Sequence, residues 1–393
     1  MIYSWLTSSF ILQKIILLFV DLFSKFKKDK PVEPDTGNIK RVCVIYPDPM
    51  GMGNFLQFLP ILKKMQNILP HAHITLFHSK SGAVKEIVKN IPELYDEAEV
   101  FPLRMGLKSN LEFAWKYRDS FDLIFMTFYT SYPVYTFLLS FSRAPYRIGF
   151  VSSAGWRGYN DNLVNIPFRM EKHVWEPDLY FRMLQPFGVN VKQDVQPYRL
   201  KLPEKARKYA QKWLSDILVE DNTCIAIHHG SNPNQKWKRW PLEHFAEIVR
   251  RLAKDKIYTI FLGSPEEGRE LENITLPENY SFNLCGKASI METAAILEKC
   301  DLLLCNDSGL MHLAVSVNTK VLAVYGPTDY ERTFPRWGGC FAIRSSSKCS
   351  PCYGFDFHGM RTPDNCGLEC LKQISVDEVM KKISTIMDLK RRV

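Results

Sequence analysis

The sequence predicts an α/β protein built from two doubly wound domains, each with a parallel β-sheet covered by helices. From Ile39 onward, short apolar runs alternate with helical patterns, which is typical of βαβ units and parallel sheets. At 393 residues the chain is longer than a single hydrophobic core usually grows, which indicates two domains. We expect these domains at residues 39–195 and 196–393, joined by a proline-containing hinge at 193–203 and facing each other across a cleft.

Each domain contains four apolar runs that we expect to be strands. Those of the first domain are residues 41–46, 74–77, 123–127 and 147–150, separated by helices near residues 54–69, 82–90, 111–119 and 134–142. Those of the second are residues 224–228, 258–262, 302–305 and 321–325, separated by helices near residues 242–253, 267–273, 290–299 and 310–317. Such folds bind ligands at the carboxyl ends of the strands, so the residues that follow the strands are the candidates for function.

The composition is that of an ordinary globular protein with a basic balance. Hydrophobic residues make up 46% of the chain, charged residues make up 24%, and the net charge is +9. A basic balance suits phosphorylated substrates, anionic lipids or nucleic acid. No nucleic-acid-binding signature is present, so we expect phosphate and lipid as partners and no nucleic acid.

The cysteines predict a reducing compartment. Five of the ten lie in or beside apolar strand-like runs, where a thiol behaves as a small hydrophobic group: Cys43, Cys224, Cys285, Cys300 and Cys305. This usage suits a cytoplasmic protein.

The N-terminal residues 1–38 are expected to form a membrane-interface helix and a linker. Residues 5–23 are apolar but are interrupted by Gln13, Lys14 and Asp21, and they lack the features of a signal peptide. A cluster of lysines follows directly, between residues 25 and 30. An apolar helix beside basic residues is typical of an anchor that lies against anionic headgroups. A spanning anchor and a helix packed on its own protein are the alternatives.

The segment Asn306 to His312 (NDSGLMH) follows the apolar run LLLC and begins a helix. Asp307 and Ser308 are suited to cap that helix, and Gly309 lets the backbone approach a ligand. The free N–H groups and positive dipole of a helix start suit a diphosphate, with His312 one turn away. The alternative is a plain helix cap followed by a surface histidine.

The segment from residue 228 to 241 (HHGSNPNQKWKRWP) also lies between a strand and a helix. Ser231 belongs to a small-residue turn that suits a phosphate or a ribose. Lys236, Lys238 and Arg239 bring positive charge, and Lys238, more than Lys236, would stabilise a leaving diphosphate. The alternative is a basic exposed loop whose tryptophans, Trp237 and Trp240, pack inward.

Together these segments resemble the heptosyltransferase family, glycosyltransferase family nine, from about residue 41 to 382. The resemblance rests on these motifs: MGNFLQFLP (52–60), RIGF (147–150), KRWP (238–241), GSPEE (263–267), GKASIME (286–292) and NDSGLMHLAVSVNTKVLAVYGP (306–327).

The resemblance implies a GT-B fold with two Rossmann-like domains and an inverting sugar transfer. It implies that the domain at 39–195 binds a lipid-linked acceptor of the lipopolysaccharide core. It also implies that the domain at 196–393 binds a nucleotide-sugar donor, typically ADP-heptose. The donor contacts of the family fall on Ser231, Lys238, either Glu266 or Glu267, Asp307, Ser308, Gly309 and His312. The enzyme would need no essential metal and would lie on the cytoplasmic face of the inner membrane. A non-catalytic relative that binds nucleotide-sugar or glycolipid, or a transferase for another nucleotide-sugar, are the alternatives.

One departure from the family concerns catalysis. The glycine–aspartate pair of the family, whose aspartate is taken to be the base for the acceptor hydroxyl, reads Gly53–Asn54 here. An amide cannot accept that proton usefully, and a general base is worth about 10²–10⁴-fold in rate. Asp48 is the nearest substitute on the same loop. Asn54 is alternatively explained as a helix N-cap.

Four cysteines near the C-terminus form two close pairs. Cys349 and Cys352 are separated by two residues, and Cys366 and Cys370 by three. Such pairs could hold a structural zinc ion in a closed tetrahedral site. Disulfide or redox pairing, and packing as reduced thiols, are the alternatives.

Overall fold

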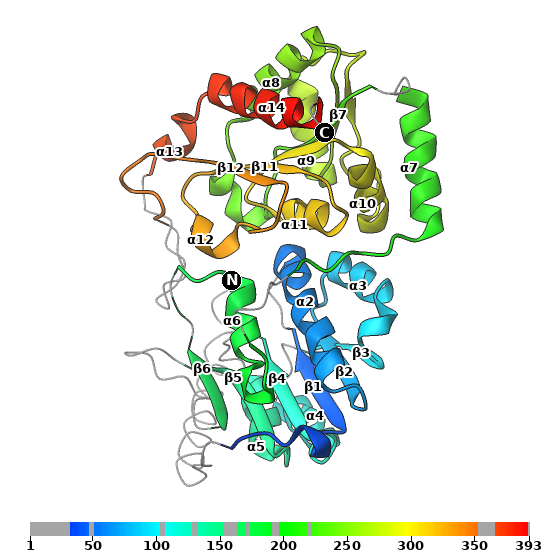
Figure 1. Cartoon of the computed structure of the whole chain (residues 1–393), viewed down its shortest axis with the longest axis vertical. Helices are drawn as coiled ribbons and strands as arrows, with labels where there is room; N and C mark the ends of the chain where they lie inside the picture. Colours follow the sequence, from blue (N-terminus) through cyan, green and yellow to red (C-terminus); the bar gives the residue numbers. More distant parts are fainter. Residues whose placement is uncertain are drawn as a thin grey trace. The chain divides into compact units, whose positions relative to one another are not determined.

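The computed structural model describes residues 32–46, 51–102, 107–127, 133–151, 163–169, 171, 173–190, 196–217, 222–352 and 366–391 (Figure 1). The chain divides into two compact units. The first comprises Met1–Gly51, Phe58–Glu171 and Pro177–Val195, and the second comprises Met52–Gln57, Lys172–Glu176 and Gln196–Val393. Two short segments from the first half of the chain therefore pack with the second unit.

The expected membrane-interface helix and Asp48 lie outside the described residues. Within the ranges given above, no helix is both long enough and apolar enough to cross a membrane.

The first unit contains a six-stranded parallel sheet in the order β3-β2-β1-β4-β5-β6. Its strands are β1 (Arg41–Ile45), β2 (His73–His78), β3 (Glu97–Val100), β4 (Leu123–Met126), β5 (Tyr146–Val151) and β6 (Ile166–Arg169). The helices of this half are α2 (Met52–Ile68), α3 (Gly82–Lys89), α4 (Leu107–Lys116), α5 (Pro133–Phe141) and α6 (Glu176–Arg182). Short 3-10 helices lie at Thr36–Asn38, Pro92–Leu94 and Gln185–Phe187.

The second unit repeats this topology with its own parallel sheet, ordered β12-β11-β10-β7-β8-β9. Its strands are β7 (Cys224–His228), β8 (Tyr258–Phe261), β9 (Ser281–Asn283), β10 (Leu302–Asn306), β11 (Val321–Tyr325) and β12 (Cys340–Arg344). Its longer helices are α7 (Glu204–Ile217), α8 (Leu242–Lys254), α10 (Ile290–Lys299), α11 (Gly309–Ser316) and α14 (Val376–Arg391). Shorter ones are α9 (Pro265–Glu270), α12 (Tyr330–Thr333), α13 (Glu369–Lys372) and the 3-10 helices Pro233–Lys238 and Leu271–Asn273.

The eight strands that the sequence predicts are the four central strands of each sheet. The four that it misses, β3, β6, β9 and β12, are the edge strands. Central strands of a parallel sheet are buried on both faces and read as continuous apolar runs, whereas edge strands are only partly covered. The edge strand β3 reads EAEV and is largely exposed, so it carries no apolar signal.

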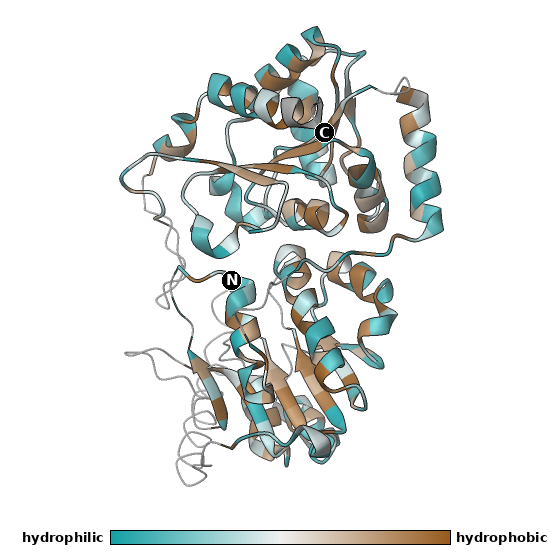
Figure 2. Cartoon of the chain, viewed as in Figure 1, coloured by the Kyte–Doolittle hydropathy of each residue, from teal (hydrophilic) through white to brown (hydrophobic). Residues whose placement is uncertain are grey.

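The core of the second unit is formed by these central strands and the helices against them. Every residue of β7, β10 and β11 is buried, and the predominantly apolar strands appear brown in Figure 2. Trp240 is buried here and donates a hydrogen bond from Nε1 to the carbonyl of Ile374. Trp240 therefore packs inward, as the alternative interpretation of its loop expected. The five cysteines predicted to be buried are all buried.

The middle of the second sheet is its topological switch point. After β7 the chain continues to β8 on one side, and after β10 it continues to β11 on the other side. Loops that leave neighbouring strands in opposite directions open a crevice at the carboxyl ends of those strands. The two segments that the sequence singles out are the loops after β7 and β10.

Candidate functional site

The loops after β7 and β10 lie side by side because the two strands pair in parallel, with Cys305 opposite His228. Asn306 joins the loops. Its side chain accepts a hydrogen bond from the backbone N–H of Trp240 at 2.9 Å and donates one to the carbonyl of His229 at 2.7 Å. One buried amide thus fixes the spacing between the two predicted binding segments.

Lys238 and Asp307 form an ion pair in the two loops that follow β7 and β10. Nζ of Lys238 lies 2.9 Å from Oδ2 of Asp307, and their side chains are only 12% and 7% exposed. Burial on its own would raise the pKa of Asp307, but the Lys238 ammonium outweighs it and the pKa of Asp307 is lowered. Asp307 is therefore ionised at neutral pH, and the pair holds a positive and a negative group at the carboxyl end of the sheet.

The start of α11 is not capped in the way the sequence suggests. Ser308 is the N-cap residue, but its side chain makes no capping hydrogen bond. Its Oγ instead shares a hydrogen bond of 2.9 Å with Nδ1 of His228. Because Ser308 does not cap them, and no other side chain of the described residues accepts a hydrogen bond from them, the first N–H groups of α11 are suited to a bound anion.

His312 is buried, so the interpretation as a surface histidine is wrong. Burial lowers its pKa to about 4, which makes the ring neutral at physiological pH. Nε2 of His312 lies 3.3 Å from Nε2 of Gln57. Nδ1 of His312 and Oε1 of Gln57 are buried and accept or donate no hydrogen bond among the described residues.

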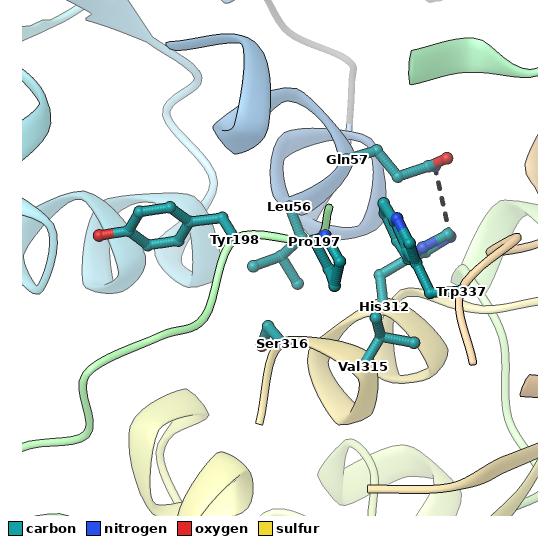
Figure 3. Close-up of a pocket in the computed structure, with 8 residues that line it drawn as sticks. All are labelled: Leu56, Gln57, Pro197, Tyr198, His312, Val315, Ser316 and Trp337. Carbon is teal, nitrogen blue, oxygen red and sulfur yellow. Dashed lines mark hydrogen bonds between the residues drawn. The ribbon is translucent and has the colours of Figure 1, made fainter. Parts of the chain in front are cut away.

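A small pocket adjoins this histidine (Figure 3). Its volume is about 10 Å³, room for about one water molecule, and it is lined by Leu56, Gln57, Pro197, Tyr198, His312, Val315, Ser316 and Trp337. Figure 3 shows the Gln57 amide and the His312 ring pointing toward each other. Buried polar atoms without partners are uncommon in proteins, so this pair is suited to a polar group of a ligand or to water.

The first turn of α2 packs against the first turn of α11 within the second unit. A Cβ atom on Gly53 would lie 3.1 Å from Cα of Gly309 and 2.9 Å from Cδ2 of His312. A glycine at position 53 is required for this approach. The N-cap of α2 is Gly51, and Asn54 lies inside the helix, so the N-cap explanation of Asn54 is wrong. Its Nδ2 instead lies 2.9 Å from both carboxylate oxygens of Glu176.

Glu267 is the centre of a buried network behind the first loop. Its carboxylate accepts hydrogen bonds from the backbone N–H groups of Ser264 at 2.7 Å and Ser231 at 3.1 Å. Burial raises its pKa, but the neighbouring His228 outweighs this, and the pKa of Glu267 is lowered to about 2. Side chains at Gly230 and Gly263 would overlap this carboxylate. Glu267 therefore shapes the loop that carries Ser231.

The other predicted donor contacts differ in their surroundings. Glu266 is 69% exposed and lies 3.3 Å from Arg269, in contrast to the buried Glu267. Oγ of Ser231 accepts a hydrogen bond from Nε of Arg239 at 3.1 Å. Lys236 is 68% exposed and pairs with Glu270 at 3.8 Å, in contrast to the buried Lys238.

The four C-terminal cysteines all carry free thiols. Cys349 is exposed, Cys352 and Cys366 are half-buried, and Cys370 is buried. Burial, together with the nearby Cys352, Cys349 and Cys366, raises the pKa of Cys370 to about 11, so the four cysteines lie near one another. In the parts of the chain that the structure describes, no three His, Cys, Asp or Glu side chains are arranged to hold a metal ion. Cysteine is nevertheless the preferred ligand of structural zinc, and the zinc site stays a prediction.

Sequence reasoning missed three residues of this site: Gln57, Glu176 and His228. Nothing in the sequence near any of these three residues identifies the side chain that it contacts. Glu176 lies 122 residues from Asn54, and Gln57 lies 255 residues from His312.

Comparison with protein families gives one match over more than half of the chain. The family model described as glycosyltransferase family 9 (heptosyltransferase) matches residues 135–355. This range contains the loops after β7 and β10 and the Lys238–Asp307 pair.

A curated relative is lipopolysaccharide heptosyltransferase 2 of Escherichia coli (strain K12). It is 28% identical over 204 residues, which are 49% of this chain and 58% of that enzyme. The chain therefore spans little more than half the length of this curated relative.

Solved structures resemble the whole described fold. A glycosyl transferase of family 9 from Veillonella parvula has a TM-score of 0.70 at 22% identity, covering 91% of this chain and 99% of that one. The ADP-heptose lipopolysaccharide heptosyltransferase II of E. coli has a TM-score of 0.67 at 20% identity, covering 90% and 100%. These structures confirm the predicted fold class, an α/β GT-B fold with two Rossmann-like doubly wound sheets.

Proposed function

We propose that this chain, which belongs to glycosyltransferase family 9, the heptosyltransferase family, is an inverting glycosyltransferase. Its donor would be a nucleotide-sugar, ADP-heptose by analogy with its relatives. Its acceptor would be the lipid-linked core of lipopolysaccharide. The observation that carries the proposal is the Lys238–Asp307 pair beside the uncapped start of α11.

The donor diphosphate would dock at the first turn of α11. Its N–H groups are not satisfied by the side chain of Ser308, and the positive end of the helix dipole favours an anion there. Gly309 carries no side chain at this turn, which lets the first turn of α2 pack closely against the start of α11. His312, neutral and with an unsatisfied Nδ1, lies one turn further on.

Lys238 would stabilise the charge that develops as the diphosphate leaves. The acceptor oxygen bonds to the anomeric carbon and its proton passes to solvent water, while the bond from that carbon to the diphosphate breaks and its electrons pass to the diphosphate. An ammonium group at this place is worth about 10²–10³-fold in turnover. Asp307 holds Lys238 in position through the 2.9 Å ion pair. Lysine and helix amides suffice for this role, so we propose that no metal ion is essential.

The acceptor proposal places the enzyme peripherally on the cytoplasmic face of the inner membrane. A lipid-linked acceptor requires the enzyme to reach a bilayer surface. The lysine-rich residues 25–30, which follow the apolar stretch 5–23, would be attracted to anionic headgroups.

The test is a transfer assay with purified full-length chain, ADP-heptose and core lipid acceptors of increasing length, read by mass spectrometry. We expect the mass of one heptose to be added to one acceptor, with or without a chelator. Lys238→Met should lower turnover by about 10²-fold or more, whereas the exposed Lys236→Met is the matched control and should retain turnover. Absence of transfer to every acceptor by a wild type that still binds ADP would favour the non-catalytic alternative.

That alternative, a nucleotide-sugar or glycolipid-binding relative without activity, is favoured by one observation. Position 54 carries an amide where a carboxylate would be needed to accept a proton. The surroundings of Asn54 therefore determine how the reaction proceeds.

A further inference from the structure

Asn54 and Glu176 form a side-chain pair between two segments of the second unit, Met52–Gln57 and Lys172–Glu176. Nδ2 of Asn54 lies 2.9 Å from Oε1 and 2.9 Å from Oε2 of Glu176. The side chain of Glu176 is 2% exposed, and Nη2 of Arg332 lies 3.9 Å from its Oε1. A carboxylate this deeply buried is retained only with such partners, so the pair is a fixed feature of the unit.

This contact determines which way the Asn54 amide points. Only the NH₂ group of an amide can donate to a carboxylate, so Nδ2 faces Glu176 and Oδ1 is turned away from it. Oδ1 accepts no hydrogen bond from any residue in the described ranges. The side chain of Asn54 is partly exposed, whereas Glu176 beneath it is buried. The pair thus presents an oriented carbonyl oxygen at the surface of the site.

Asn54 lies near the helix start where we propose that the donor diphosphate docks. Its neighbour Gly53 approaches Gly309 and His312, which begin α11. The diphosphate would dock at that helix start, and the attacked carbon of the sugar is bonded to the diphosphate. An acceptor hydroxyl must come to this carbon, and Asn54 directly follows the residue that packs against this helix start.

We propose that Oδ1 of Asn54 accepts a hydrogen bond from the acceptor hydroxyl and that Glu176 is the positioning residue that holds the amide for this contact. The inference rests on the proposed function. The negative charge of Glu176 strengthens the donated hydrogen bonds and polarises the amide, which makes Oδ1 a better acceptor. Alignment of the hydroxyl is the contribution of the pair, and neither residue is given the proton.

An aspartate at position 54 would conflict with Glu176. Two carboxylates in direct contact repel each other, and one of them must bind a proton. Asn54→Asp in the wild-type background should therefore destabilise the protein at neutral pH. The reversed pair, Asn54→Asp with Glu176→Gln, restores one donor and one acceptor because the glutamine amide can donate to the new carboxylate.

A kinetic cycle tests whether Glu176 acts through Asn54. Asn54→Ala should lower kcat by about 10²-fold, the usual effect of misplacing a reacting group, with the Kd for ADP unchanged within about twofold. Glu176→Gln should lower kcat by about tenfold or more. The double variant should be no slower than Asn54→Ala alone, because Glu176 has nothing to position once the amide is gone. Glu171 is an exposed carboxylate five residues before Glu176, so Glu171→Gln is the control and its kcat should be unchanged.

Additive losses of kcat in this cycle would show that Glu176 acts directly and would overturn the inference. Thermal unfolding provides the second measurement if a variant folds poorly. At pH 7 Asn54→Asp should lower Tm, and the reversed pair should restore the wild-type Tm. The Tm difference between Asn54→Asp and the wild type should become smaller toward pH 4–5, where a carboxylate binds a proton. An unchanged Tm in Asn54→Asp would exclude the contact. A wild type that transfers no sugar would overturn the proposed function, whereas an active wild type with an additive cycle overturns this inference alone.

Discussion

Lys238→Met should destabilise the protein by removing one partner of a nearly buried ion pair. Removing a partner from a fully buried pair costs about 3–5 kcal/mol, because the remaining charge loses its compensation. Lys238 retains 12% exposure, and water screens part of this loss. We therefore expect a decrease of about 1–3 kcal/mol in the free energy of unfolding at pH 7.

The pH dependence of this decrease gives a sharper test. In the wild type the folded-state pKa of Asp307 is lowered, so this carboxylate contributes stability above its unfolded pKa of about 4 and loses it as pH falls through the folded pKa. Without Lys238, burial dominates and raises the pKa of Asp307 above its unfolded value. Asp307 then contributes stability below about pH 4, which is lost as pH rises through the raised pKa. The stability difference between the two proteins should thus narrow as pH falls from 7 toward 4.

Urea unfolding of the wild type, Lys238→Met and Lys236→Met at pH 7, 5.5 and 4 measures this difference. The exposed Lys236 controls for the loss of a lysine from the same loop, and its variant should lie within about 0.5 kcal/mol of the wild type at each pH. Two results would refute a stabilising Lys238–Asp307 ion pair. One is an equal free energy of unfolding for Lys238→Met and the wild type at pH 7, and the other is a difference in this free energy that is the same at every pH.

Three further predictions concern other parts of the chain. Deletion of residues 1–30 should release the protein from vesicles that contain anionic lipid, and high salt should partly reproduce this, since each lysine near such a surface contributes about 1 kcal/mol; a truncated chain that still floats with the vesicles places the anchor elsewhere. Protein purified without chelator should contain about one zinc per chain, and Cys352→Ser or Cys366→Ser should lower both zinc content and stability, while metal-free protein with titratable thiols would favour reduced packing. His312→Ala should weaken ADP binding about tenfold, the value of about one hydrogen bond, without unfolding the protein. Because the pKa of His312 is about 4, its contribution should not change between pH 5.5 and 8, and an inflection near pH 6.5 that the variant removes would contradict a neutral ring.

The central strands and the two binding loops could be predicted because their signals are local. Asn306 to His312 combine the end of a strand, a small-residue turn and the start of a helix within seven neighbouring residues. The topology then brings this loop beside Lys238, because β7 and β10 pair in the middle of the sheet. Edge strands such as β3 were missed because partial exposure removes the apolar pattern.

The roles of individual polar residues could not be predicted because they depend on partners distant in sequence. Asn54 has the chemistry of a helix cap, and only the contact with Glu176 shows that it is held as an oriented amide. Ser308 is the N-cap residue as expected, but its hydroxyl forms a hydrogen bond with His228 and does not cap the first N–H groups of α11. Glu266 and Glu267 are adjacent in a motif, yet one is exposed and the other is buried beneath Ser231.

Calorimetric titration with ADP tests most directly whether the donor diphosphate docks at Lys238 and the start of α11. The wild type and Lys236→Met should bind ADP with the same Kd, and this binding should weaken as salt rises. Lys238→Met should bind at least about tenfold more weakly, the loss expected when one charged contact to a phosphate is removed. Equal affinity of all three proteins for ADP would contradict a donor site at this crevice.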